Sequence, residues 1–234
     1  MPRVRANDYD DKKSKILDAA ATLFAAQGYA GSRMEEIAAA CGVSKSMLYH
    51  YFSKKEDVLF DILQEHVLDL IDTMRQYLAQ NGLHDKSAFF CGFVEVYLRP
   101  SGNSRARHVV ALHDMRYLTD EQKKEQIKLE RELLGLVESA LEYLKPGAAR
   151  SDYRVSAFLL IGMLNWVELW YRRSGRMSPN ELYQQVTTLF LTGFLEEGAN
   201  RGLTQGLSGF TSDADLAPLK RQQRRKKQQS TTSQ

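Results

Sequence analysis

The sequence predicts an all-α fold, with a three-helix helix-turn-helix domain at the N-terminus followed by a larger helical domain. Three observations lead to this prediction. Apolar residues recur every three or four positions along most of the chain, and no run shows the alternation typical of a strand. The five prolines, at positions 2, 100, 146, 179 and 218, lie at the edges of these periodic segments. Two short helical segments within residues 32–52 are separated by Gly42, which permits a sharp turn.

Composition and length indicate an ordinary globular protein. The chain has 234 residues, of which 43% are hydrophobic and 26% charged, so it can bury a large core. Its two cysteines are too few for a disulfide framework. Residues 1–15 lack the apolar run of a signal peptide, and the most apolar stretch, 155–171, contains Asn165 and Glu168. We therefore expect a cytoplasmic protein with no membrane partner.

The net charge of +3 is unevenly distributed. Residues 202–234 carry a net charge of +4, which leaves −1 for residues 1–201. The cations of this tail are Lys220, Arg221, Arg224, Arg225, Lys226 and Lys227. The polar composition at its end cannot bury enough apolar area to offset the entropy of ordering, so we expect a disordered basic tail. Any nucleic-acid binding by the folded body must come from a local patch.

The first two helices have clear sequence signals. The first is expected over about 12–26, where apolar residues form one stripe, and Gly28 ends it. The second is expected to start at Ser32, because Ser32 and Glu35 have the spacing of a capping box, and to end at Gly42.

The remaining helices follow from the same patterns. A third helix is expected over about 44–51. Ser53 and Glu56 form another capping-box spacing that opens a long helix reaching about Gln80. Pro179 marks the first turn of the last helix. The later helices are expected at about 86–99, 104–117, 119–144, 151–173 and 179–200.

The two short helices have the pattern of a DNA-reading motif. Val43 and Leu48 are spaced to face inward, and the small Ala38 allows close approach of the helices. The residues that then point outward from the second of these helices are Lys45, Ser46, Tyr49 and His50. A helix-turn-helix presents its recognition helix to the major groove in this way. The alternative is an αα-hairpin with a solvated polar face.

Residues 12–59 resemble the N-terminal domain of the TetR family of bacterial transcriptional regulators. The matching segments are Ile16–Ala20 with Phe24, Gly28–Tyr29, Met34–Ala38, Gly42–Lys45, Leu48–Phe52 and Lys55–Glu56. The resemblance implies a DNA-binding domain over 1–58 and a variable ligand-binding and dimerisation domain over 59–201, before the tail at 202–234. It also implies a homodimer that binds a palindromic double-stranded DNA operator and releases it when a small molecule binds.

The resemblance also implies which residues contact DNA. Lys45, Ser46 and Tyr49 fall where the family contacts bases or nearby phosphates. His50 and Tyr51 fall where it contacts the backbone. For Tyr49 and His50 the alternative is simple packing, and Tyr51 can equally pack against the first helix.

Three further positions complete the expected DNA surface. Lys55 begins the fourth helix, where a cation and a helix N-terminus approach a phosphate together. Ser32 occupies the family's usual Thr position, which caps the second helix and can donate to phosphate; the alternative is capping alone. Arg33 departs from the small residue common there and is expected to add a phosphate or base contact.

The second domain offers candidate ligand residues rather than a motif. Ligand pockets pair aromatic walls with a few polar groups. Side chains that fit this pattern within apolar surroundings are Cys91, Glu95, His113, Asn165, Trp166, Glu168 and Trp170. The alternative is that they are satisfied inside a helical core or interface. The stretch 155–171 is apolar almost all round, which predicts a buried helix, and with 179–200 it resembles the family's four-helix dimer interface.

The nature of the effector is suggested by a second resemblance. Trp166 and the segment from Trp170 to Pro179 look like a branch of the family that senses acyl-CoA thioesters. Arg172, Arg173 and Arg176 could then pair with CoA phosphates, or they could form a solvated basic turn. We expect a small hydrophobic effector such as an acyl-CoA. The competing expectation is a sensor of cationic drugs, whose charge Glu95 or Glu168 would face.

The sequence argues against catalysis and bound cofactors. It contains no G-x-S-x-G elbow, no phosphate-binding G-x-x-x-x-G-K-[ST] and no G-x-G-x-x-G. His108 and His113 are about 140° apart around a helix, so they make no obvious metal pair. We expect a non-enzyme without cofactor or metal. A second non-enzyme possibility is an architectural protein that coats DNA through its basic tail.

Overall fold

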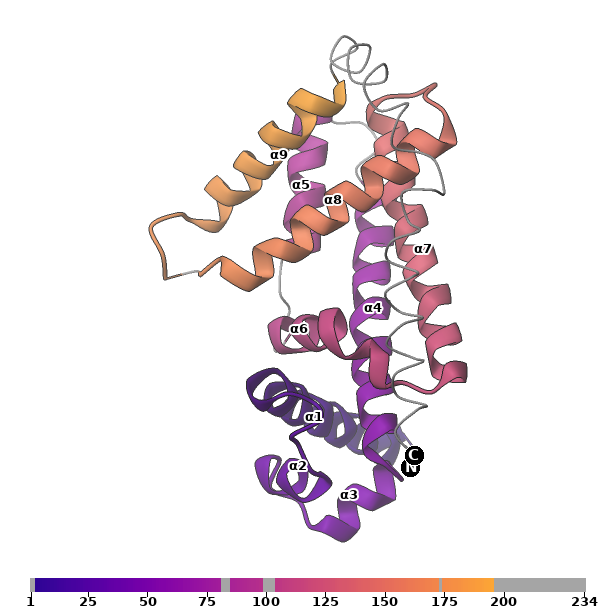
Figure 1. Cartoon of the computed structure of the whole chain (residues 1–234), viewed down its shortest axis with the longest axis vertical. Coiled ribbons are helices and arrows are strands. Elements are labelled where there is room, and N and C mark those ends of the chain that lie inside the picture. The colour runs from indigo at the N-terminus through magenta and orange to yellow at the C-terminus, as the bar shows by residue number, and fades with distance from the viewer. Residues whose placement is uncertain (1–2, 81–84, 99–103, 173, 196–234) are drawn as a thin grey trace, which may run out of the picture. The chain divides into compact units, whose positions relative to one another are not determined.

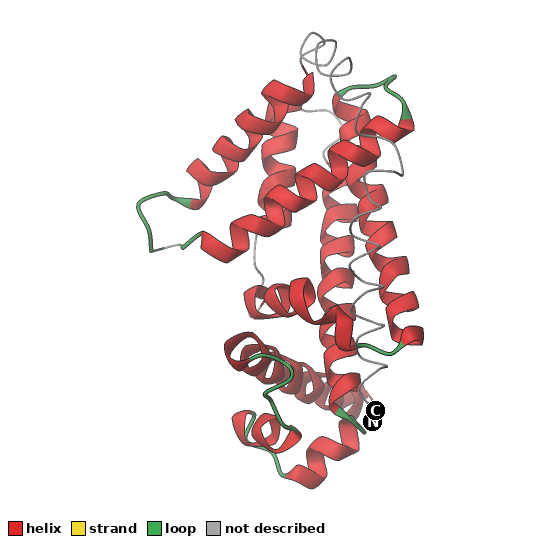
Figure 2. Ribbon diagram, in the orientation of Figure 1, coloured by secondary structure: helices red, strands yellow, loops and turns green. Residues whose placement is uncertain are grey.

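The computed structural model describes residues 3–80, 85–98, 104–172 and 174–195. Within these residues the chain contains helices and loops and no strand, which confirms the predicted all-α class (Figure 2). The chain divides into two compact units, Met1–Leu191 and Thr192–Gln234. The described residues of the second unit, 192–195, end the last helix, and the basic tail predicted for 202–234 lies outside the described residues.

The first unit begins with a long helix, α1, over Arg3–Gln27 (Figure 1). It starts about three turns before the predicted position, because no proline or glycine interrupts residues 3–12 even though they lack an apolar stripe. The helix ends as predicted. Gly28 takes the left-handed conformation, with φ of +82°, and its N–H donates to the carbonyl of Phe24 at 2.8 Å.

The second helix, α2, spans Met34–Ala40, and the prediction that Ser32 caps it is wrong. The Ser32 side chain is buried, and its hydroxyl donates to the carbonyl of Gly28 at 2.8 Å. The capping residue is Arg33, whose backbone N–H donates to the Glu36 carboxylate at 2.8 Å. Ser32 therefore satisfies a carbonyl directly after α1 and does not cap α2, because its hydroxyl donates to the carbonyl of Gly28.

The third helix, α3, spans Lys45–Tyr51, close to the predicted 44–51, and Ser44 is its capping residue. The Ser44 hydroxyl accepts from the N–H of Met47 at 3.1 Å. Gly42 has φ of +70°, which supplies the turn between α2 and α3. Leu48 is fully buried and Val43 packs against the same core, as the spacing predicted.

Seven further elements follow α3. Their bounds are α4 Lys55–Gln80, α5 Lys86–Leu98, α6 Ser104–Asp114, the 3-10 helix η1 Met115–Tyr117, α7 Asp120–Leu144, α8 Arg150–Trp170 and α9 Pro179–Leu195. These agree with the predicted segments, except that α8 ends before residue 173 and that residues 196–200, predicted as helix, lie outside the described residues. Thr119 caps α7 through a reciprocal pair of hydrogen bonds with Gln122, at 3.3 and 3.0 Å.

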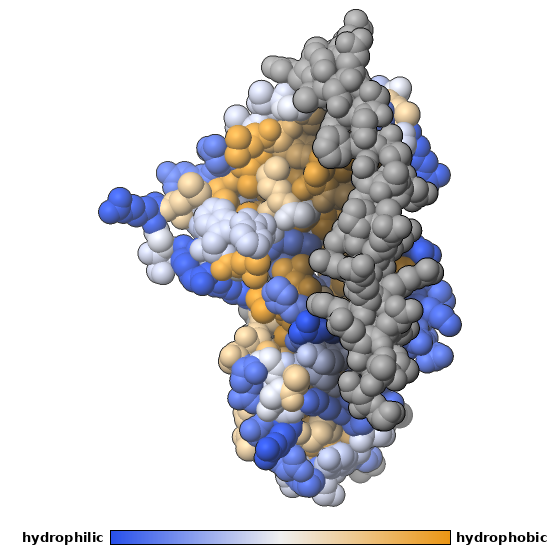
Figure 3. Space-filling view, in the orientation of Figure 1, coloured by the Kyte–Doolittle hydropathy of each residue, from blue (hydrophilic) through white to orange (hydrophobic). Residues whose placement is uncertain are grey.

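Helix α8 is apolar on two opposite faces, and the single chain buries only one of them. Ala157, Leu160 and Leu164 are fully buried, whereas Phe158 and Leu159 are 59% and 66% exposed. Figure 3 shows apolar residues gathered over α8 and α9. Burial of both faces was predicted for a helix within a dimer interface, which a single chain does not test; among the described residues, the face that carries Phe158 and Leu159 is exposed.

Candidate nucleic-acid interface

Helix α3 presents one face to solvent and one to the core. Lys45, Ser46, Tyr49 and His50 are all exposed, while Leu48 between them is fully buried. The predicted outward orientation of these four side chains is therefore confirmed. Their contact with DNA stays a prediction, which the placement of polar and aromatic groups on the first turns of α3 supports.

Sequence reasoning missed Met47 on this face. Its side chain is 41% exposed, similar to the 43% of Tyr49. Local spacing gave no firm signal, because neighbouring residues about 100° apart on a helix can both face the core, as Val58 and Leu59 of α4 do. An unbranched apolar side chain here can contact the methyl group of a thymine in the major groove.

Lys45 has a carboxylate partner across the helix-turn-helix. Its Nζ lies 2.6 Å from Oε1 of Glu35 on α2. The shared hydrogen bond raises the pKa of Lys45 and lowers the pKa of Glu35. Both side chains are more than half exposed, so the pair is screened by water and exchanges readily with other ions. A phosphate or a guanine edge would compete with Glu35 for this ammonium.

Lys55 supports the loop between α1 and α2. Its Nζ donates to the carbonyls of Tyr29 and Ser32, each at 2.7 Å, and lies 4.2 Å from the centroid of the Tyr29 ring. The ammonium thus ties this loop to the first turn of α4. Its predicted contact with a phosphate remains a prediction, and the structure adds a structural role that the sequence did not indicate.

Tyr51 packs against the first helix, as one of the two alternatives predicted. Its ring stacks on Tyr9 of α1 with centroids 4.6 Å apart, and it is half-buried. The stack fixes the C-terminal end of α3 against α1. Arg33 is exposed at the start of α2, and its predicted contact with DNA stays a prediction.

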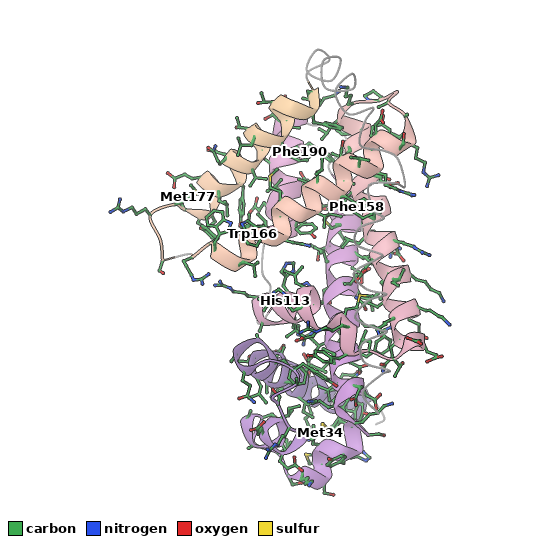
Figure 4. The ribbon with its side chains drawn as sticks, in the orientation of Figure 1. Met34, His113, Phe158, Trp166, Met177 and Phe190 are labelled. Carbon is green, nitrogen blue, oxygen red and sulfur yellow. The ribbon has the colours of Figure 1, made fainter. Side chains whose placement is uncertain are left out.

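The candidate ligand residues are spread over three helices and the turn after α8. Figure 4 shows His113 on α6, Trp166 and Phe158 along α8, and Phe190 on α9. Asn165 is half-buried, and its Oδ1 accepts from the Tyr97 hydroxyl at 2.8 Å. This pair links α5 to α8, and the sequence did not indicate that Tyr97 is the partner of Asn165.

The other candidates differ in exposure. Cys91 and Glu95 are half-buried on α5. The exposed candidates are His113, Trp166 at 64%, Trp170 at 49%, Arg172 and Arg176. The side chain of Glu168 and all of Arg173 lie outside the described residues. The structure therefore does not gather the candidates into one buried cluster, and their role in ligand binding stays a prediction.

The chain matches two family models in succession. Residues 16–62 match the model described as bacterial regulatory proteins of the tetR family, and residues 87–194 match a tetracyclin repressor-like C-terminal domain. A solved TetR-family transcriptional regulator from Bordetella parapertussis is 39% identical, with a TM-score of 0.70, over 78% of this chain and 95% of that one.

Two further proteins extend the comparison. The transcriptional repressor KstR2 of Rhodococcus jostii is 29% identical over 194 residues, covering 78% of this chain and 90% of the repressor. The structure of AibR in complex with isovaleryl coenzyme A and operator DNA has a TM-score of 0.63 at 23% identity. It covers 77% of this chain and 97% of AibR, and at this identity it shows a shared fold.

Proposed function

Because this chain belongs to the TetR family of bacterial transcriptional regulators, which bind DNA and are not enzymes, we propose that it is a dimeric repressor that a small hydrophobic ligand releases from a palindromic operator. We assign DNA binding to residues 1–58, ligand binding and dimerisation to 59–201, and a disordered basic tail to 202–234. No helix in the described part of the chain is long and apolar enough to cross a membrane. We place the protein in the cytoplasm, where its proposed target lies.

The observation that carries the DNA-binding proposal is the exposed face of α3. Lys45, Ser46, Tyr49 and His50 project from a helix whose opposite side is locked into the core by Leu48. A rigidly seated helix of two turns with a cation, hydroxyl groups and aromatic rings on its exposed side fits the major groove. Selection of operators from random DNA with purified protein tests this: enrichment of one palindrome supports it, and enrichment of no sequence contradicts it.

The dimer proposal rests on the second apolar face of α8 and on α9. Phe158, Leu159 and Trp166 of α8 are 59%, 66% and 64% exposed, and Leu189 of α9 is 61% exposed. Spacings of seven residues from Leu159 to Trp166 and eight from Phe158 to Trp166 put these α8 side chains on one stripe. Contiguous apolar surface of this kind marks a protein interface, and a second copy of the same face satisfies it by two-fold symmetry.

For the effector we propose an acyl-CoA or a related thioester. The apolar part would contact α5, where Phe90 and Phe93 are fully buried, and α8. Arg172 and Arg176 are exposed after α8, where they can reach phosphates. AibR, which shares the fold, was solved with isovaleryl coenzyme A and operator DNA, which supports the ligand class without establishing it here.

Release from DNA requires the effector to bind better to a dimer whose recognition helices do not match successive major grooves, about 34 Å apart. Only this difference in affinity shifts the population, and a ten- to hundredfold release corresponds to about 1.4–2.8 kcal/mol of coupling. A ligand with equal affinity for both states would leave the operator occupied.

Titration of long-chain, aromatic and steroid-derived acyl-CoAs against a preformed protein–operator complex tests the ligand class. Release by one of these at micromolar concentration supports the proposal. Release by cationic dyes alone would favour the drug-sensor alternative, in which Glu95, half-buried on α5, faces the cation. Equal binding to operator and random DNA, insensitive to both ligand sets, would favour the architectural alternative.

A further inference from the structure

A buried arginine joins three helices at the boundary between the two domains. Arg107 of α6 is only 7% exposed. Its Nη2 lies 2.8 Å from Oδ1 of Asp18 on α1, and its Nη1 lies 2.9 Å from Oε2 of Glu65 on α4. The Nε also donates to Asp18 at 2.9 Å. We refer to Arg107, Asp18 and Glu65 as the Arg107 junction.

The planar geometry of the Arg107 guanidinium fixes the directions of its contacts with Asp18 and Glu65. The guanidinium is planar and rigid, so its two edges fix the positions of the two carboxylates, and with them α1 and α4, relative to α6. A buried ion pair adds little net stability compared with apolar residues of the same size, because removing the charges from water costs almost as much as the pairing returns. The junction is therefore better suited to setting a geometry than to stabilising the fold.

The next residue adds a second polar link between α6 and α4. Nδ1 of His108 and Nε2 of His66 share a hydrogen bond of 3.0 Å. Burial lowers the pKa of His108 to about 4 and that of His66 to about 3, the latter with help from the positive charge of Arg107. At neutral pH the two rings form an uncharged, hydrogen-bonded pair that holds the register of α6 on α4.

Apolar packing places α6 and η1 in the core of the DNA-binding domain. Val110 of α6 and Leu118, directly after η1, are buried in the same cluster as Leu17, Phe24 and Leu48. The cluster therefore extends from α1–α3 through the first half of α4 to residues 110–118. Helix α6 packs against both α1 and α4 (Figure 1).

An aromatic contact continues this packing to the start of α2. The Tyr117 ring of η1 lies 4.7 Å from the ring of Tyr29, and Tyr29 in turn lies beneath the ammonium of Lys55. Lys55 holds the carbonyl of Ser32, next to the first residues of α2. The segment 104–118 thus contacts the helix-turn-helix from behind and belongs to its core, although it lies in the chain segment assigned to ligand binding.

From these contacts we propose that Arg107 is a positioning residue for operator binding: by clamping Asp18 and Glu65 it sets the orientation of the helix-turn-helix relative to α4. Helix α6 also packs against α8, so the Arg107 junction lies on the helix that connects the proposed ligand-binding domain with the DNA-binding domain. The part of the inference that concerns operator binding rests on the proposed function. The part that concerns the position of α1 rests on the geometry alone. On this proposal, residues 104–118 move together with the DNA-binding domain, although they follow it in the sequence.

The test compares four variants of the full chain with the wild type. Asp18→Asn removes the charge on the α1 side of the clamp and so weakens it, although the amide oxygen can still accept from Arg107, while Arg107 keeps Glu65; the change is mild because the Asp18 side chain is 41% exposed. Arg107→Met removes the clamp, so Asp18 and Glu65 both lose their contact with the guanidinium, and Glu65 keeps a 3.9 Å contact with Lys13. The triple variant Arg107→Met, Asp18→Asn, Glu65→Gln removes all three charges. The control is Arg75→Met, which removes an exposed arginine of α4 that pairs with Glu132 of α7.

Two readouts separate positioning from stability. The first is operator affinity on duplexes whose half-sites are moved together or apart by one base pair, with melting temperature measured in parallel. Arg107→Met should lower the melting temperature by about 10 °C, and the triple variant should recover most of this loss. Asp18→Asn and the triple variant should bind the selected operator about tenfold more weakly and discriminate less between half-site spacings. Arg75→Met should match the wild type.

The second readout does not need an operator. Hydrogen exchange in Asp18→Asn should accelerate in α1 and α3 while α7 and α8 remain as in the wild type. Wild-type spacing preference and wild-type exchange in Asp18→Asn and the triple variant would overturn the proposal and leave Arg107 with a structural role only. If the wild type selects no palindrome, the proposed function fails, but the exchange experiment still tests the inference. Accelerated exchange in α1 and α3 would support the role of Arg107 in positioning α1, and unchanged exchange would contradict it.

Discussion

Lys45 on the recognition helix α3 and Glu35 on α2 form an ion pair of 2.6 Å on the exposed surface of the helix-turn-helix. In the absence of DNA the Glu35 carboxylate therefore pairs with the ammonium group that we propose contacts DNA. DNA must displace Glu35 or tolerate its charge close to the phosphates. If Lys45 contacts DNA as proposed, Glu35 competes with every phosphate for this ammonium and should weaken non-specific binding modestly, because the exposed pair is screened by water.

Glu35→Gln should raise affinity for DNA and reduce the discrimination between operator and random sequence. The substitution keeps the shape of the side chain and removes the negative charge, so Lys45 becomes available to any phosphate. Gel-shift titrations on both DNAs at two salt concentrations measure the effect. Glu142→Gln, an exposed carboxylate of α7, serves as the matched control. Equal or weaker binding of Glu35→Gln to random DNA would contradict the role given to the pair.

Tyr49→Ala should weaken operator binding without unfolding the protein. The ring is 43% exposed on α3, so its removal leaves no cavity, whereas loss of a base contact costs about 1–3 kcal/mol. The loss should be larger on the operator than on random DNA. Tyr143→Ala, which removes a ring 37% exposed on α7, should leave both affinities unchanged. Wild-type affinity in Tyr49→Ala would show that α3 does not read DNA through this residue.

Stability should fall on acidification because of the His66–His108 pair. The pKa values in the folded protein, about 3 and about 4, lie below the ordinary value of 6.5, so the unfolded chain binds more protons. The contribution of the pair is complete above pH 6.5 and is lost progressively as the pH falls through 4 toward 3. The slope is at most about 1.4 kcal/mol per pH unit for each ring.

Melting temperatures at pH 7.5, 6.5, 5.5 and 5.0 measure this loss. The variant His66→Asn, His108→Asn keeps amide groups in place of the rings and should show a shallower decline below pH 6.5. Exposed His50, on α3, provides the control as His50→Asn. Identical slopes in the wild type and the double variant would show that the carboxylates alone cause the acid sensitivity.

Charging the exposed face of α8 should break the proposed dimer. Leu159→Glu replaces an apolar side chain that is 66% exposed in the single chain, so the fold of the protomer should survive. In a symmetric interface the substitution places two like charges in apolar surroundings, one from each copy. Sedimentation at micromolar concentration should show the wild type as a dimer and the variant near the 26.7 kDa of one chain. Gln76→Glu on the exposed side of α4 is the control, and a monomeric wild type would refute the dimer.

Several features were predictable because they depend on residues close in sequence. The stop of α1 at Gly28, the Ser44 cap and the outward side of α3 all follow from groups within one or two helical turns. The start of α2 was not predictable in this way, although its residues are equally local. The sequence offered Ser32 as the cap, but its hydroxyl donates instead to the carbonyl of Gly28 at the end of α1, so α2 begins one residue later, after Arg33.

The amino-acid sequence by itself determined the helical class, the helix-turn-helix and the residues that α3 turns to solvent, because helical periodicity and capping are encoded over a few positions. Only the tertiary structure decided the partners of Arg107, Lys55 and Tyr51. Arg107 and Asp18 are 89 positions apart, and no local pattern says which charges meet when helices pack. The same holds for α8: its sequence shows that it is apolar all round, but only the arrangement of its neighbours shows which face the chain buries and which it leaves exposed.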